Sequence, residues 1–297
     1  MRDKEKASAQ AERSVVRDKE KVSAQAERSV VRDKEMNRPV ITLLSDFGAG
    51  DHYAGAMKGV ILDICPDAQL VDISHEVTPY AITEAAFTLS QAWVCFPAGS
   101  IHLVVVDPGV GSSRRPILVE AEGHLFVAPD NGVLTMVYGA APLHEVREIT
   151  ASRYFRKPVS RTFHGRDIFG PVAAQLANGL APDEAGTRIG DYLRLGFATP
   201  VRTGHRTWAG TILKVDRFGN VITNFDSESW QRLAVERFEM KIGQRTVART
   251  ASNYAEVDEG ELFVIAGSAG FLEISMNRGS AAKTAGARSG DALEIRL

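Results

Sequence analysis

The chain has 297 residues, of which 44% are hydrophobic and 24% are charged, a balance typical of soluble globular proteins. The formal net charge of −2 shows no basic excess, which argues against nucleic acid as a main partner. No apolar run approaches the roughly 18 residues that a membrane span requires, and the charged N-terminus lacks the apolar region of a signal peptide. We therefore expect a cytoplasmic protein with no membrane partner. Cys65 and Cys95 form no CxxC motif, which argues against a disulfide framework or a zinc ribbon, and their apolar surroundings predict that both are buried.

The N-terminal segment is an internal repeat. RDKEKASAQAERSVV (Arg2 to Val16) recurs as RDKEKVSAQAERSVV (Arg17 to Val31), and a third copy begins at Arg32. The repeat is rich in charge and has no aromatic residue, so it cannot bury enough apolar surface to fold alone. We predict a disordered or frayed-helical extension over residues 1–36.

Strand-like and helix-like patterns alternate over residues 37–198. Short apolar runs rich in β-branched residues predict strands buried on both faces of a sheet, and apolar residues recur between them with helical spacing. The predicted elements are strands beginning at 39, 69 and 101, helices at 51–65 and 81–96, two short strands within 116–138, and a helix at 168–177. This alternation predicts a three-layer α/β domain with a mostly parallel sheet.

Two polar segments of this domain connect predicted elements. Asp130-Asn131-Gly132 is a strong turn signal, and most of its polarity needs no function beyond the turn. His164, Arg166 and Asp167 are expected in a loop just before the helix at 168–177.

The pattern changes after Pro200. Residues 205–297 contain short β-like segments, such as TWAGTILKVD, NVITNF, GELFVIAG and LEISMN, separated by turns that contain glycine. This pattern predicts a second, all-β domain, a small barrel.

Three acids, Asp46, Asp107 and Asp216, each end a predicted strand beside a glycine. Ligands bind to open α/β sheets at the carboxyl ends of the strands, where such a carboxylate can bind a ribose diol or accept a proton from water. It can also simply cap a turn. Asp107 stands out because its loop, DPGVGSSRR, adds two arginines, Arg114 and Arg115, that a turn does not need.

Other chemistries lack their motifs. There is no HxH, HExxH or His-Cys cluster for a catalytic metal, no GxSxG for a nucleophilic serine, and no GK[ST] ending for a Walker phosphate loop. We therefore expect neither a metal nor a cofactor.

Seven motifs resemble the S-adenosyl-L-methionine hydroxide adenosyltransferase family, the adenosine-forming S-adenosylmethionine hydrolases related to the fluorinating and chlorinating adenosyl enzymes. They occur in the family's order over about residues 38–297 and do not include the N-terminal repeats. In chain order they are SDFG (Ser45 to Gly48), DISHxVxPY (Asp72 to Tyr80), VVDPGVGSxRR (Val105 to Arg115), APDNG (Ala128 to Gly132), TFHGRDIF (Thr162 to Phe169), DRFGNxxTN (Asp216 to Asn224) and GSAGFLEISMNRGSAA (Gly267 to Ala282).

The resemblance implies an α/β domain followed by a β-barrel, and a homotrimer that binds its ligand between one subunit's N-terminal domain and a neighbour's C-terminal domain. It places the family's catalytic Asp-Arg-His set on Asp107, Arg114 and His164. The remaining implied positions bind substrate. Asp46 would bind the ribose, Asp216 the methionine amino group and Asn220 the adenine. Tyr80, at the end of DISHxVxPY, would also contact substrate, and the methionine and adenine pockets would be lined by Ser268, Glu273 and Arg278.

The same resemblance favours water over halide as the nucleophile. The halogenating relatives carry tyrosine at the position of Asp107 and serine at the position of Gly165, and they lack the arginine and histidine partners. Fluorinating members also have an insertion before the motif that here reads APDNG, where this chain is short.

The expected reaction is hydrolysis of S-adenosyl-L-methionine to adenosine and L-methionine, with possible preference for the non-natural sulfonium epimer. Free water has a pKa of about 15.7, so a positioned base helps. Asp107 would orient and help deprotonate the water, Arg114 would stabilise negative charge, and His164 would orient the pair or relay the proton. Three alternatives stay open: Arg115 acting in place of Arg114, a binding protein that senses the ligand without turnover, and a halogenase.

Overall fold

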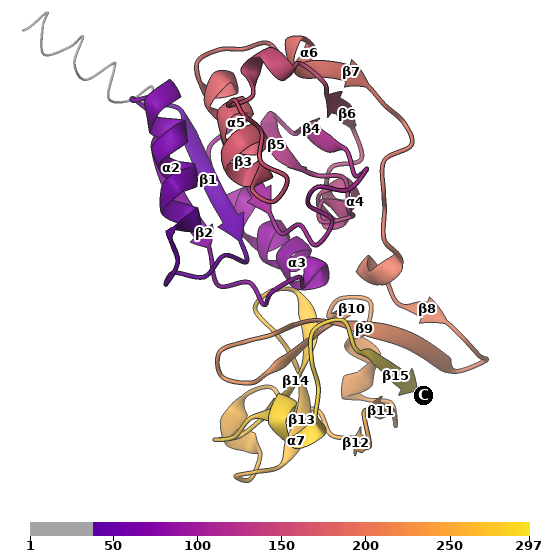
Figure 1. The fold of residues 1–297 in the computed structure, drawn as a ribbon. Helices are drawn as coiled ribbons and strands as arrows, with labels where there is room; N and C mark the ends of the chain where they lie inside the picture. The colour runs from indigo at the N-terminus through magenta and orange to yellow at the C-terminus, as the bar shows by residue number, and fades with distance from the viewer. Residues whose placement is uncertain (1–37) are drawn as a thin grey trace, which may run out of the picture. The chain divides into compact units, whose positions relative to one another are not determined.

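The computed structural model describes residues 38–297 (Figure 1). The predicted N-terminal extension lies outside the described residues. The helices are α2 (His52–Ile64), α3 (Ile82–Ala92), α4 (Thr135–Ala140), α5 (Gly170–Ala177), α6 (Pro182–Ala185) and α7 (Ala281–Ala285). Short 3-10 segments cover Trp93–Cys95, Ser152–Tyr154, Gly196–Ala198, Gln231–Ala234 and Tyr254–Glu256, and a π-helical turn covers Gly165–Phe169.

The strands form two separate sheets. The first contains β1 (Val40–Ser45), β2 (Gln69–Ser74), β3 (Ile101–Val105), β4 (Pro116–Ala121), β5 (His124–Pro129), β6 (His144–Ile149) and β7 (Gly186–Arg188). The second contains β8 (Val201–Arg202), β9 (Thr207–Val215), β10 (Val221–Asp226), β11 (Glu239–Ile242), β12 (Arg245–Val247), β13 (Leu262–Ala266), β14 (Phe271–Met276) and β15 (Ala292–Arg296).

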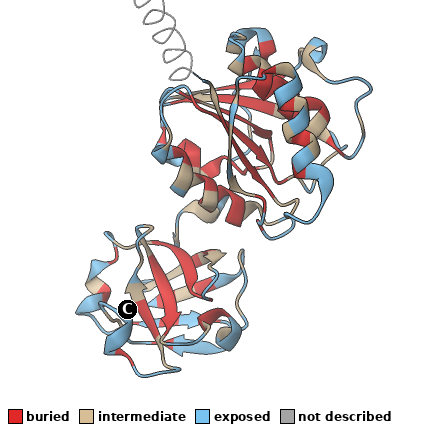
Figure 2. Ribbon diagram, turned by 90° about the vertical axis from the view of Figure 1, so that its left-hand side faces the viewer, coloured by how far each residue is buried: buried red, intermediate tan, exposed pale blue. Residues whose placement is uncertain are grey.

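The first sheet has the order β2-β1-β3-β5-β4-β6-β7. Strands β2, β1, β3 and β5 pair in parallel, β6 runs in the same direction, and β4 and β7 run in the opposite direction. Every residue of β3 is buried, as its apolar sequence predicts for a central strand covered on both faces (Figure 2). The predicted α/β architecture with a mostly parallel sheet is confirmed.

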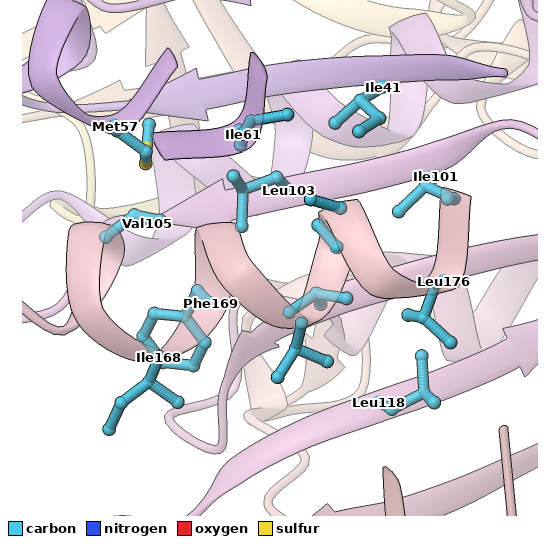
Figure 3. Packing of buried hydrophobic residues seen from close by; sticks show 14 of the residues in the cluster. Ile41, Met57, Ile61, Ile101, Leu103, Val105, Leu118, Ile168, Phe169 and Leu176 are labelled. Atoms are coloured by element: carbon cyan, nitrogen blue, oxygen red, sulfur yellow. The ribbon is translucent and has the colours of Figure 1, made fainter. Parts of the chain in front are cut away.

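Helices cover both faces of this sheet and bury an apolar core on each. On one face, Met57 and Ile61 of α2 and Phe169 pack with Leu103 and Val105 of β3 (Figure 3). On the other face, side chains from α3 and α4 pack against the alternate residues of the same strands, such as Val104. Each fully buried side chain of this size stabilises the fold by about 1.5–3 kcal/mol, so these layers fix where the strand ends lie.

The second sheet is antiparallel and rolls into a barrel-like domain, as predicted. Its strand order is β12-β11-β15-β9-β10-β14-β13, with β8 paired to β9. A parallel bridge between Thr250 and Val264 extends the pairing beyond the strands. Phe225, Ile274 and Ile295 are among the fully buried residues of its core.

Two local predictions are wrong. Cys65 is buried, but Cys95 is exposed at the end of the 3-10 turn that follows α3. Arg166 and Asp167 lie in the π-helical turn rather than in a loop, and His164 caps it. None of the helices in residues 38–297 combines the length and the apolar character needed to cross a membrane.

The π-helical turn has a local cause. Pro171, at the start of α5, has no N–H and so cannot donate to the carbonyl of Asp167 one helical turn earlier. That carbonyl instead accepts the N–H of Arg156 at 2.9 Å, while Gly170 N–H bonds to Gly165 O across the wider turn. His164 therefore lies at the beginning of a widened turn.

Candidate active site

Asp107, Arg114 and His164 form one connected group. Asp107 follows β3, and its carboxylate accepts two hydrogen bonds from Arg114 Nε, at 3.0 and 2.8 Å, and a further one from Nη2. The same Nη2 lies 2.8 Å from His164 Nδ1. Since a guanidinium only donates, His164 Nδ1 must accept, and the neutral ring carries its proton on Nε2.

The side chains of Asp107 and Arg114 are buried. The side chains of Arg114 and Asp107 are 8% and 5% exposed, and the Arg114 guanidinium lies 5.0 Å from the centroid of the Phe169 ring. Burial lowers the pKa of His164, and the positive charge of Arg114 lowers it further, with Asp107 and Asp167 acting in the opposite direction. The imidazole is therefore neutral at pH 7.

Close backbone packing joins the two loops that carry these side chains. Gly111 has φ +77°, and a Cβ at this position would lie 2.4 Å from the carbonyl oxygen of Arg161. Only glycine allows this approach of the Asp107 loop to the segment that leads into His164.

Arg115 points elsewhere. Its guanidinium donates to Asp130 Oδ2 at 2.7 Å and to Asp191 Oδ1 at 2.8 Å. Of the two arginines, Arg114 contacts Asp107, so the alternative that Arg115 takes this role in place of Arg114 is not supported.

Asp46 and Tyr80 are also brought together. Tyr80 N–H donates to Asp46 Oδ2 at 2.9 Å, and Tyr80 has φ +68° with a side chain that is 71% exposed. Next to Asp46, Ser45 Oγ bonds to His75 Nδ1 at 2.7 Å, and His75 Nε2 lies 3.1 Å from Asp72. The fully buried Ser45 cannot act as a nucleophile, so this Ser-His-Asp chain braces the end of β1 and with it Asp46.

In the barrel domain, Asp216 is held by its own turn. Its Oδ1 accepts the N–H groups of Phe218 and Asn220 at 2.9 and 2.8 Å, and its Oδ2 accepts Asn220 Nδ2 at 2.8 Å. These hydrogen bonds cap the turn that follows Asp216. Burial raises the pKa of Glu273, and the charge of Asp216 raises it further, which places the two carboxyl groups near each other.

The last two candidates, Arg278 and Ser268, have fewer contacts with the other candidate residues. Arg278, at φ +52°, forms an ion pair with Glu259 and lines a cavity of about 620 Å³ together with Asn220 and Phe218. Ser268 is exposed in the turn between β13 and β14. The hydrogen bonds of the candidate residues thus form separate groups: Asp46 with Tyr80, and Asp107 with Arg114 and His164, in the α/β domain, and Asp216 with Asn220 in the barrel.

Comparison with known proteins identifies the family of this chain. Residues 41–186 match the SAM hydroxide adenosyltransferase N-terminal domain, and residues 210–294 match the C-terminal domain of the same family. The chain belongs to the SAM hydroxide adenosyltransferase family. One relative, named (R)-S-adenosyl-L-methionine hydrolase, from Thermus thermophilus, is 35% identical over 88% of this chain and 99% of its own.

A solved structure of an uncharacterized conserved protein from Thermotoga maritima has the same fold. Its TM-score is 0.77 at 41% identity, and the match covers 86% of this chain and 100% of that one. A fluorinase from Nocardia brasiliensis is 26% identical over 67% of this chain and 75% of its own. The Thermus thermophilus hydrolase is therefore more similar to this family member than the fluorinase is.

Sequence reasoning missed two supporting residues of the site. Phe169, which stacks on Arg114, appeared in a motif but had no assigned role. His75 likewise stood in a motif, and only the pairing of β1 with β2 shows that it reaches Ser45.

Proposed function

We propose that this chain hydrolyses (R)-S-adenosyl-L-methionine to adenosine and L-methionine. The observation that carries the proposal is the buried Asp107–Arg114–His164 group at the carboxyl end of β3. The substrate is inferred from two comparisons: the chain matches the family over most of its length, and a relative is named as the hydrolase. The (R) configuration at sulfur is the finer part of the proposal.

The reaction is an in-line displacement at the 5′ carbon. A water oxygen forms the new C–O bond as the C–S bond breaks, and the electron pair of that bond goes to sulfur, which leaves as the neutral thioether of methionine. Asp107 accepts the proton of the attacking water, because a carboxylate retains lone pairs when its oxygens already bond to Arg114. Positioned general-base help of this kind contributes about 10²–10⁴-fold.

Arg114 and His164 play supporting roles in this proposal. The guanidinium stabilises negative charge on Asp107 and on the nucleophile in a site where little water screens it. His164 has Nδ1 occupied by Arg114 and a proton on Nε2, so it orients Arg114 instead of relaying the proton. This assigns the base to Asp107.

The binding residues divide between the two domains. Asp46 would bind the ribose, beside Tyr80. Asp216, Asn220, Glu273, Arg278 and Ser268 would bind methionine and adenine from the barrel of a neighbouring copy, in a homotrimer. We place the enzyme in the cytoplasm, acting without metal or cofactor.

A halogenase is the less favoured activity. The resemblance places Asp107 where the halogenating relatives have tyrosine, and Gly165 where they have serine. A Cβ at Gly165 would lie 3.3 to 3.4 Å from Met57, Phe47 and Val105, so an added side chain would crowd this wall of the site.

The test is product analysis with the full chain. The purified protein is incubated with each sulfonium epimer, with and without EDTA, and products are separated by chromatography. Adenosine and methionine from the (R) epimer, unaffected by EDTA, support the proposal. S-adenosylhomocysteine formed with a methyl acceptor, 5′-chloro-5′-deoxyadenosine in high chloride, or tight binding with no product would each contradict it. Analytical ultracentrifugation tests the trimer separately.

A further inference from the structure

The loop that carries Asp107 and Arg114 crosses the end of another strand. In the sheet, β5 lies between β3 and β4, although β4 comes before β5 in the chain. The segment from Val106 to Arg115, which joins β3 to β4, must therefore pass over the carboxyl end of β5. The turn that follows β5, Asp130-Asn131-Gly132, lies between the two ends of this segment.

Asn131 binds the first end. Its Nδ2 donates to the carbonyl oxygen of Val106, the residue before Asp107, at 2.8 Å. Its Oδ1 accepts the N–H of Val133 at 3.1 Å, which is the ordinary contact of an asparagine in a turn. The turn needs the second contact and does not need the first.

Asp130 binds the other end. Its N–H donates to the carbonyl oxygen of Arg115 at 2.9 Å, and its Oδ2 accepts from Arg115 Nε at 3.1 Å and Nη2 at 2.7 Å. The Asp130 side chain is only 4% exposed. A buried carboxylate is a costly way to build a turn, so its ion pair with Arg115 calls for another explanation.

The direction of Arg114 depends on these contacts. Arg115 precedes Pro116, a position that favours extended backbone, and the two neighbouring side chains bind different partners. Arg115 binds Asp130, whereas Arg114 binds Asp107 and His164, so fixing Arg115 against Asp130 favours the direction of Arg114. We propose that Asp130 and Asn131 are positioning residues that hold both ends of the Asp107 loop and so keep Arg114 on Asp107 and His164. This inference rests on the proposed function for its kinetic consequence only.

Asn131→Asp is the sharpest variant. It keeps the acceptor for Val133 N–H and replaces the donor to Val106 with an oxygen, while Asp130→Asn removes the charge that holds Arg115 and keeps the backbone contact. The matched control is Asp191→Asn, since Asp191 also pairs with Arg115 but is 80% exposed and lies outside the turn. Cooperative thermal melting identifies the variants that fold.

Two readouts separate positioning from a purely structural role. Displaced groups near the reacting atoms cost about 10- to 100-fold in rate, so kcat should fall by that factor in either variant while KM changes by less than about threefold. Independently, the pKa of His164, followed by NMR and assigned with His164→Gln, should rise because the Arg114 charge moves away. The control should match the wild type in both.

Each result decides the matter. If folded Asn131→Asp and Asp130→Asn retain the wild-type kcat and His164 pKa, the two residues only shape the turn and the inference is wrong. If the His164 pKa rises in these variants but the wild type releases no adenosine, the positioning role stands and the proposed function fails.

Discussion

Arg114 Nη2 faces His164 Nδ1 at 2.8 Å while the same guanidinium holds both carboxylate oxygens of Asp107. One cation thus connects Asp107, in the loop after β3, with His164, in the turn before α5, and Arg114 itself lies 50 positions before His164 in the chain. The contact fixes the protonation of the imidazole, because its Nδ1 must stay an acceptor. Variants of Asp107 and Arg114 test this connected group directly.

Asp107→Asn should abolish turnover without abolishing binding. The amide keeps the shape of the carboxylate but is a poor base, so we expect kcat to fall about 10²–10⁴-fold. Adenosine affinity, measured by calorimetry, should stay within a few-fold of wild type. Ser113→Ala, in an exposed position of the same loop, serves as the control. Wild-type turnover by Asp107→Asn would remove this carboxylate from the mechanism.

Arg114→Met should destabilise the fold because it leaves the Asp107 carboxylate buried and unpaired. Removing one partner of a buried ion pair costs about 3–5 kcal/mol, measurable as the free energy of unfolding in urea. The double variant Arg114→Met/Asp107→Asn should be more stable than Arg114→Met alone, since the uncompensated charge is gone. Equal stability of Arg114→Met and the double variant would show that the uncompensated charge of Asp107 carries no penalty.

Asp46→Ala should mainly weaken nucleoside binding. Hydrogen bonds to a charged group are each worth about 1.5–3 kcal/mol, so the Kd for adenosine should rise roughly 10- to 100-fold. Asp63→Ala, which removes an exposed carboxylate from α2, controls for the change in net charge. An unchanged Kd would refute the ribose-binding role of Asp46.

Stability should decrease in acid because of a buried histidine pair. His102 bonds to Thr42 at 2.7 Å and to His124 at 3.1 Å, and burial, followed by the charge of His124, lowers the pKa of His102 to about 3. Below about pH 6.5 the unfolded chain takes up a proton at His102 that the folded chain does not. The free energy of unfolding should therefore fall by about 1.4 kcal/mol per pH unit between pH 6 and 3.

The measurement is a series of urea titrations from pH 8 to pH 3. His102→Gln should flatten the decline, because glutamine does not titrate and can still bond to Thr42. Since Phe96, Phe126 and Trp93 surround the two imidazoles with apolar rings, no carboxylate of this cluster offsets the effect. An acid decline of the same steepness in His102→Gln would assign it to other groups.

Central strands such as β1 and β3 could be predicted because VITLLS and IHLVV are short runs rich in apolar, β-branched residues. Strands β6 and β7 were not predicted, because HEVREI is interrupted by charged residues and GTR is only three residues long. The wide turn at Gly165–Phe169 could not, since it depends on Pro171 withholding one N–H and on Arg156 supplying another from an earlier turn. The local spacing of apolar residues does not indicate that Arg156, from an earlier segment, donates to the carbonyl of Asp167.

Of the residues that form the site, some could be predicted from the sequence and others could not. The motifs identified Asp107, Arg114 and His164, and the structure brings them together. The roles of Asp130 and Asn131 were not visible, because the contacts arise from the β3-β5-β4 order of the sheet, which the chain order hides. A turn sequence looks the same whether or not another loop crosses it.

Asp130 also has a second partner residue, Leu193, with a consequence for how the two domains are linked. Its Oδ1 accepts the N–H of Leu193 at 2.8 Å, and Leu195 packs so closely over Gly132 that a Cβ there would lie 2.3 Å from its side chain. The connector between the domains is thus fastened to the same short turn as the Asp107 loop. Surface connectors usually accept insertions, but this one should not. An insertion within residues 191–195 would weaken its contacts with Asp130 and Gly132, and Asp130 also holds Arg115 of the Asp107 loop. The position of the catalytic loop therefore constrains the length of the connector.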